Sequence, residues 1–204
     1  NQKEGQAGKA IELYKKSIEL FPKKVDAYSN LATVLKDIGK IKEAEIYIRK
    51  AIKVDPNFAV GHKNLGKILR YLGKLEEAEM STREAIKLQP NLAEAHLTLG
   101  IILKDLGKLI EAELSTKRAI ELKTNFAEAY LNLGIILKDL RKLEQARIYT
   151  LKAIELRPNS AECHLNLGNI LRDLERIKEA EISMRKAIEL KPNLVMAYNN
   201  LGNL

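Results

Sequence analysis

Three histidines, His62, His96 and His164, have the residue type and the regular spacing from which a metal site is built. Each occupies the same position of a repeated segment, and tyrosine takes that position in the other copies. Neighbouring copies should lie roughly 10 Å apart, the usual separation of packed helices, whereas zinc–nitrogen bonds are about 2 Å long. We therefore expect the histidines to pack within the structure, and we expect no metal site.

Two further features could carry chemistry. Residues 61–67 have the glycine spacing of a phosphate-binding loop, but Ile68 stands where Ser or Thr must bind magnesium. Cys163, the one cysteine, holds a position otherwise given to Ala or Gly, which predicts a small buried residue. No Ser-His-Asp, Cys-His or paired-carboxylate arrangement stands apart from the repeat. We expect no catalytic residue, no cofactor and no enzyme activity.

The elements that position these residues recur every 34 residues. A Leu-Gly pair recurs at Leu65, Leu99, Leu133, Leu167 and Leu201, and an alanine recurs at Ala10, Ala44, Ala78, Ala112, Ala146 and Ala180. A fixed period of this size indicates one helical unit stacked in a line, in which each unit buries its apolar face against its neighbours.

Residues 93–126 illustrate one unit. Apolar residues at helical spacing predict a first helix that ends near Gly107 and a second helix through Leu122. Gly107 suits a left-handed residue. The same position holds Arg141 and Glu175 in later repeats, where positive φ would cost roughly 1 kcal/mol each. All five prolines share one position and should end each second helix. The asparagines that follow them are predicted N-caps.

This pattern resembles the tetratricopeptide repeat (TPR) family, whose motif is legible in Tyr130, Leu133-Gly134, Ala146, Ala153 and Pro158. The resemblance implies an all-α fold, a right-handed α-solenoid superhelix of antiparallel helix pairs. It covers residues 1–204 as a single array: a partial repeat at 1–24, full repeats at 25–58, 59–92, 93–126, 127–160 and 161–194, and a partial repeat at 195–204. In this family the first helices line the concave face.

On that face the resemblance places an asparagine row, which we define as Asn30, Asn64, Asn132, Asn166 and Asn200. Asparagine is a mediocre helix former, and its amide can both donate to and accept from the backbone of an extended peptide. The row is similar to the asparagine ladder of protein O-linked N-acetylglucosamine transferases. The other interpretation is that these amides cap polar groups of neighbouring repeats.

A basic row accompanies it: Lys36, Arg70, Lys104, Lys138 and Arg172. It forms either an edge of the groove that selects acidic peptides or a set of solvated helix ends, since aspartates follow four of the five cations.

A third inward set is apolar in the central repeats: Leu97, Ile101, Leu131, Ile135 and Leu165. An exposed apolar strip marks an interaction surface, and the alternative is partial burial within the superhelix. Lys63, Asn64 and Lys67 are similar to part of the carboxylate clamp of Hsp70/Hsp90-binding TPR proteins. The following repeats lack the rest of that clamp, so we do not expect a co-chaperone.

Composition limits the partners. With 46% hydrophobic and 30% charged residues the chain should fold, and no run of about 18 apolar residues predicts a membrane span. The net charge of +8 would favour binding to nucleic acid. However, acidic residues are interleaved with the cations, and Tyr71 is the one aromatic residue of the inner face on which a base could stack. Nucleic acid is disfavoured.

We expect a cytoplasmic scaffold that holds an extended protein or peptide segment in its concave groove. The alternative is a substrate-recruiting segment of a larger enzyme such as a glycosyl- or sulfotransferase, because the last residues lie in a first helix without a polar cap. A third alternative is end-to-end self-association, in which repeat stacking continues between molecules through these uncapped ends.

Overall fold

The computed structural model describes residues 2–204, with side chains from residue 6 onward, and confirms the predicted all-α repeat architecture. The described residues form helices and no strands. The chain divides into two compact units, unit 1 (Asn1–Leu106) and unit 2 (Gly107–Leu204). Unit 1 contains α1 (Gln2–Leu20), α2 (Val25–Asp37), α3 (Ile41–Val54), α4 (Ala59–Tyr71), α5 (Leu75–Leu88) and α6 (Ala93–Asp105). Unit 2 contains α7 (Leu109–Leu122), α8 (Ala127–Asp139), α9 (Leu143–Leu156), α10 (Ala161–Asp173), α11 (Ile177–Leu190) and α12 (Val195–Gly202).

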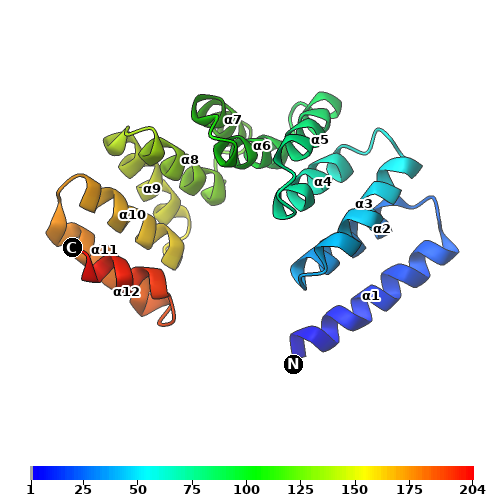
Figure 1. The fold of residues 1–204 in the computed structure, drawn as a ribbon, viewed down its shortest axis with the longest axis horizontal. Coiled ribbons are helices and arrows are strands. Elements are labelled where there is room, and N and C mark those ends of the chain that lie inside the picture. Colours follow the sequence, from blue (N-terminus) through cyan, green and yellow to red (C-terminus); the bar gives the residue numbers. More distant parts are fainter. Residues whose placement is uncertain (1) are drawn as a thin grey trace. The chain divides into compact units, whose positions relative to one another are not determined.

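Within each unit, consecutive helices form antiparallel pairs (Figure 1). In unit 1, α2 pairs with α3 and α4 with α5, while α1 packs on α2 and α6 packs on α4 and α5. In unit 2, α8 pairs with α9 and α10 with α11, while α7 packs on α8 and α12 packs on α11. The division between the units falls inside the predicted repeat 93–126.

Small residues bring the paired helices close together, as the repeat pattern predicts. The alanines at the 44, 78, 146 and 180 positions are completely buried. A Cβ added to Gly66 would collide with Thr82 Oγ1, and one added to Gly134 would collide with Thr150 Oγ1. Both threonines are short and fully buried, so they have little room to move. The glycine is therefore a requirement of the helix contact.

The predicted left-handed turns between the helices of a pair are confirmed. Gly39, Gly73 and Gly107 have φ of 82°, 74° and 75°. Arg141 and Glu175 have φ of 60° and 61° although neither is a glycine. Each of these residues is exposed. The cost at Arg141 and Glu175 therefore comes from the backbone conformation itself.

The prolines follow the second helices, as predicted, but the prediction of asparagine N-caps is wrong. Asp55 O accepts a hydrogen bond from Phe58 N at 3.2 Å, which places Pro56 and Asn57 at the centre of a turn. Proline at the second position of such a turn has the φ that the turn needs. Each first helix thus begins two residues after its asparagine. Of the N-cap residues of α2 to α12, only Ser160 caps its helix with a side chain, which accepts from Cys163 N.

The histidines join the first helices α4, α6 and α10 to the turns before them. His62, His96 and His164 Nε2 lie 3.0, 2.8 and 2.9 Å from the carbonyl oxygens of Pro56, Pro90 and Pro158. Tyr28 Oη donates to Pro22 O in the same way, at 3.1 Å. Proline has no N–H, but its carbonyl still needs a partner. The shared geometry explains why His and Tyr alternate at this position.

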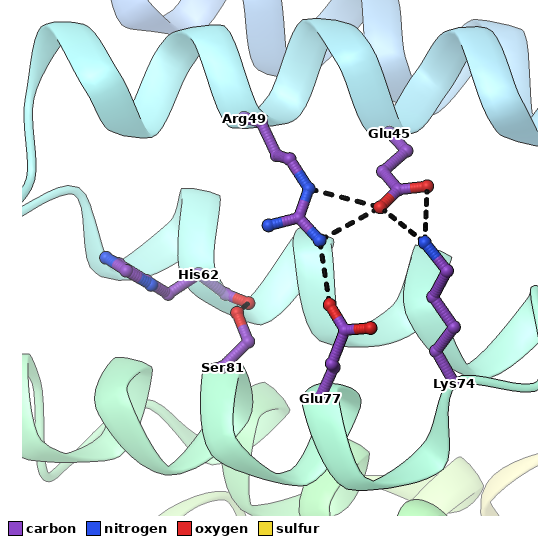
Figure 2. Close-up of polar contacts among 6 residues, drawn as sticks. All are labelled: Glu45, Arg49, His62, Lys74, Glu77 and Ser81. Atoms are coloured by element: carbon purple, nitrogen blue, oxygen red, sulfur yellow. Dashed lines mark hydrogen bonds and ion pairs between the residues drawn. The ribbon is translucent and has the colours of Figure 1, made fainter.

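Ion pairs on the second helices connect successive repeats. Figure 2 shows that Glu45 accepts hydrogen bonds from Arg49 on its own helix and from Lys74, which precedes α5. Arg49 also reaches Glu77 at 3.0 Å. In unit 2, buried Glu113 accepts from Lys117 and Lys142, each at 2.7 Å. Burial alone would raise the pKa of the Glu113 carboxyl, but the hydrogen bonds and charges of both lysines lower it overall.

We expect Arg141→Gly to raise the free energy of unfolding by about 1 kcal/mol, because it removes the left-handed strain of an L-residue. Gly73→Arg is the matched reverse change, since an added Cβ there meets nothing within 4 Å, and it should lower the free energy by a similar amount. Urea unfolding followed by circular dichroism measures both. Changes of the same sign in the two variants would contradict the assignment.

We expect Glu113→Gln to destabilise the protein by about 1–2 kcal/mol at pH 7, because a buried carboxylate loses two charge-assisted hydrogen bonds. The folded pKa of Glu113 is lowered, so its contribution is present above the unfolded pKa of about 4.3 and is lost as pH falls through the folded value. The difference between wild type and variant, measured by urea unfolding, should therefore shrink toward pH 3.

Glu121→Gln is the control, because Glu121 lies on the same helix in an exposed pair with Arg118 and should change stability little at any pH. A Glu113→Gln penalty that stays constant from pH 7 to pH 3 would show that the carboxylate's charge is not its source.

Candidate functional site

The candidate site is the first-helix face, by which we mean the asparagine row, the basic row and the five predicted apolar positions. Most amides of the asparagine row already have a partner. Asn64 Nδ2 donates to Ser29 Oγ at 2.9 Å, Asn132 Nδ2 to Glu128 O at 2.8 Å, and Asn200 Nδ2 to Asn169 Oδ1 at 2.7 Å. Each uses one of its two N–H groups and leaves the rest of the amide for other bonds.

The two remaining asparagines mark the extremes of the row. Asn166 is 7% exposed, and its Nδ2 donates to Thr150 Oγ1 at 2.9 Å, inside the α9–α10 contact. Asn30 is exposed. The row is therefore graded: one member belongs to the core, one faces solvent, and three lie between these limits with fixed amides.

The basic row carries its own counter-charges. Lys36 pairs with Asp37 at 2.7 Å, Lys104 with Asp105 at 3.1 Å, Lys138 with Asp139 at 3.6 Å and Arg172 with Asp173 at 3.2 Å. Arg70 also binds Asp105, which bridges α4 and α6. Lys36 Nζ and Arg70 Cζ lie 5.8 and 5.9 Å from the centre of the Tyr71 ring. The row is thus largely neutralised within the chain.

The apolar set divides into buried and accessible members. Leu97 is 3% and Leu165 is 8% exposed, so these two follow the burial alternative and do not belong to an exposed strip. Leu165 packs against Ala187 and Ala197 of α11 and α12, which explains its burial. Ile101, Leu131 and Ile135 are half-buried and remain accessible.

Each unit has a cavity of about 290 Å³ on this face. The cavity of unit 1 lies between α2 and α4 and is lined by Thr33, Lys36, Lys63, Asn64, Lys67 and Ile68. The cavity of unit 2 lies between α8 and α10, and its lining includes Leu131, Asn132, Ile135 and Cys163. Both contain an amide of the asparagine row. The α4 residues of the first cavity face the preceding first helix, α2, whereas the α8 residues of the second face the following first helix, α10. The second cavity also has Glu128, Arg157 and Glu162 in its lining.

The sequence analysis missed an apolar row on the second helices. This outer apolar row is exposed by 55–73% and consists of one residue per full repeat: Ile46, Met80, Leu114, Ile148 and Ile182. The signal that could have found it is the same 34-residue period, at a position outside the buried set. Because the second helices are apolar at several positions, the sequence does not distinguish a displayed residue from a buried one.

The remaining chemical candidates have structural positions. Cys163 is 2% exposed, and burial raises the pKa of its thiol, which keeps it protonated and unreactive. Among the described residues no group of three or more His, Cys, Asp or Glu side chains could hold a metal ion. None of the described helices is long and apolar enough to cross a bilayer.

Family models of the tetratricopeptide repeat match residues 2–68 and, repeat by repeat, residues 64–92, 93–126, 127–160 and 161–194. The chain belongs to the tetratricopeptide repeat family. Its members are protein-interaction scaffolds. Among curated proteins, none matches this TPR sequence.

Solved structures with the same fold include three that match most of this TPR chain. PilF of Pseudomonas aeruginosa superposes with a TM-score of 0.77 at 20% identity over 100% of both chains. TTC0263 of Thermus thermophilus gives 0.75 at 18% identity over 88% of this chain and 97% of its own. YrrB, described as a TPR protein with an unusual peptide-binding site, gives 0.68 at 24% identity over 95% and 100%. These similarities show the fold.

We expect Asn166→Ala to lower the free energy of unfolding by about 1–2 kcal/mol, because it leaves a buried Thr150 hydroxyl without its donor and opens a small void. Asn30→Ala should change it by less than about 0.5 kcal/mol, since Asn30 is exposed. Urea unfolding measures both changes. Equal effects of the two variants would show that the row is not graded as described.

Proposed function

We propose that this TPR chain is a non-catalytic scaffold that holds an extended segment of a protein partner along its first-helix face. The observation that carries the proposal is the pair of cavities, one in each unit, that contain an amide of the asparagine row. A peptide backbone needs both donors and acceptors along its length, and the bonds that Asn64 and Asn132 make within the chain occupy one N–H of each amide.

The geometry of these amides supports a ladder similar to that of the O-linked N-acetylglucosamine transferases. An amide already held by one hydrogen bond has lost its rotamer freedom before a ligand arrives, so binding costs less conformational entropy. In this proposal Asn64 and Asn132 bind the segment's backbone, Asn30 and Asn200 extend the contacts, and Asn166 supports the helix packing.

Side-chain selection is assigned to the residues that differ between repeats. Ile101, Leu131 and Ile135 are accessible apolar side chains on first helices, and burying one against a partner stabilises a complex by about 25 cal/mol per Å². The basic row contributes little in this proposal, because its aspartates already neutralise it.

The proposal gives the chain itself no catalytic step. The histidine rings bind proline carbonyls and the Cys163 thiol is buried. The side chains most able to act in catalysis therefore have structural roles. Recruitment of a substrate to an enzyme would use the same face, and the experiment below tests that face in either setting.

The test selects binders from a library of random dodecapeptides and measures their dissociation constants by fluorescence anisotropy. The double variant Leu131→Ala, Ile135→Ala should weaken the selected peptides about tenfold or more, which corresponds to about 1.4 kcal/mol of lost burial. The control is Ile148→Ala, Ile182→Ala on the outer apolar row of the same unit, which should leave the constants unchanged.

The opposite pattern, with weakening only in the outer-row variant, would move the binding site to the second helices and overturn the proposal. A library from which the wild type selects no peptide would overturn it as well.

A further inference from the structure

Unit 2 has a further cavity, of about 280 Å³, among α9, α10 and α11. Its apolar lining comes from all three helices: Leu151, Leu167, Leu171 and Ile182. Ser183, which is buried, adds a small side chain to the lining. Because Ile182 belongs to the outer apolar row, this cavity lies on the second-helix side and is separate from the first-helix face.

One repeat earlier, the chain places its own aromatic ring in the corresponding space. Tyr149 stands 34 residues before Ser183, and its half-buried ring packs against the core cluster that contains Leu133 and Leu137. These two leucines are the repeat equivalents of the two that line the cavity on α10. Tyr47 holds the same position in unit 1 and packs against the core there. A tyrosine ring therefore fits between the helices at this position of the repeat.

The missing ring leaves apolar surface uncovered. Leu133 and Leu137, which pack with Tyr149, are completely buried, whereas Leu167 in the cavity is 8% exposed. Leu151 and Ile182 are exposed more strongly still. Apolar surface in contact with water carries a free-energy cost that an apolar occupant of the cavity would remove.

In unit 1, a serine at this position is accompanied by an ion pair. Ser81 lies one turn from Glu77, and Glu77 binds Arg49 of α3 at 3.0 Å, so the pair joins two successive second helices (Figure 2). Four of the five full repeats have Arg or Lys at the position of Arg49, but the fourth has Leu151. Leu151 cannot bind Glu179, the equivalent of Glu77. The cavity thus lacks both the ring and this ion pair.

The charged residues of the lining, Arg147 and Glu179, are balanced within the chain. Arg147 binds Glu144 at 2.9 Å and Glu179 binds Arg176 at 2.7 Å. The cavity therefore offers mainly apolar contact to an occupant. A guanidinium and a carboxylate can each still form a hydrogen bond with the hydroxyl of a tyrosine.

An aromatic side chain matches this space. A dry apolar cavity of about 150 Å³ already binds benzene, so the larger cavity here admits a phenol-sized ring. Aromatic side chains inserted into pockets are common anchors of protein interfaces. We infer that the cavity is a docking pocket for a tyrosine or phenylalanine side chain of a protein partner, which inserts as Tyr149 does one repeat earlier. It gives the chain a second binding surface beyond the proposed one.

The first experiment titrates p-cresol, which is the tyrosine side chain as a free molecule, into the full chain labelled at its Ile and Leu methyl groups. The methyl resonances of Leu151, Leu167 and Ile182 should show ring-current shifts, because these side chains line the pocket. The concentration dependence of the shifts gives the dissociation constant.

Two variants remove the pocket in different ways. Ser183→Tyr supplies the ring of Tyr149, and Leu151→Arg supplies the cation of the other repeats. Both should weaken p-cresol binding about tenfold or more, because the apolar surface is already covered. Ser183→Ala keeps the space open, and Ile148→Ala removes an exposed side chain of α9 outside the lining. Both of these controls should bind p-cresol as the wild type does.

A selection from a random dodecapeptide library then tests whether a protein segment supplies the ring. Peptides that wild type retains and Ser183→Tyr does not should be enriched in Tyr and Phe. They should bind the Leu131→Ala, Ile135→Ala variant as tightly as wild type, because those substitutions alter the first-helix face. Circular dichroism and thermal midpoints establish that the variants fold, and Leu151→Arg provides the test if Ser183→Tyr does not.

The pocket would be overturned if p-cresol shifted none of these methyl groups, or bound both pocket variants as tightly as wild type. Pocket-dependent peptides enriched in aliphatic residues, or no peptide that depends on the pocket, would overturn the aromatic partner. A wild-type dimer in sedimentation that Ser183→Tyr dissociates would overturn it as well and assign the pocket to a second copy of the chain. The Leu131 and Ile135 test of the proposed function is independent of each result.

Discussion

A pair of helices in a 34-residue repeat is too small to bury its own apolar face, and this constraint governs the rest of the structure. Alanines and glycines at fixed positions let the two helices of a pair approach until Gly66 meets Thr82 and Gly134 meets Thr150. The larger residues, such as Leu31 and Leu69 in unit 1, then fill the spaces between successive pairs. Stability in such an array comes from contacts between neighbours, since no pair has a core of its own.

Polar contacts set the register between successive pairs. The proline carbonyl oxygens are hydrogen-bonded to a His or Tyr side chain of the following helix. The Glu45 and Glu113 carboxylates bind lysines of the following repeat. Each of these contacts joins groups that would otherwise lose hydration without a partner. These contacts lie at the turns and on the second helices, so they add to the bonds that the first-helix face makes within the chain, such as Asn64 to Ser29.

The difference between packing positions and surface positions of the first helices explains how the repeats vary. Positions needed for packing keep the same small or apolar residue, whereas the first-helix position held by Lys63 in one repeat is held by Leu131 two repeats later. A repeat protein can therefore acquire different selectivity along its length without changing its scaffold. The outer apolar row is the exception, because it is apolar in all five full repeats and yet exposed.

The sequence by itself determined the features that depend on local physics: the helix pairs, the proline stops and the left-handed turns at Gly39 as well as Arg141. It misplaced the helix starts, because Pro-Asn forms a turn before the N-cap. Only the tertiary structure decided what each surface position does. Leu131 and Leu165 occupy the same repeat position, but Leu165 is buried by α11 and α12 while Leu131 stays accessible. Asn166 is likewise buried and Asn30 exposed. Burial and pairing depend on which neighbouring helix reaches a residue, and a periodic sequence specifies the position without specifying that contact.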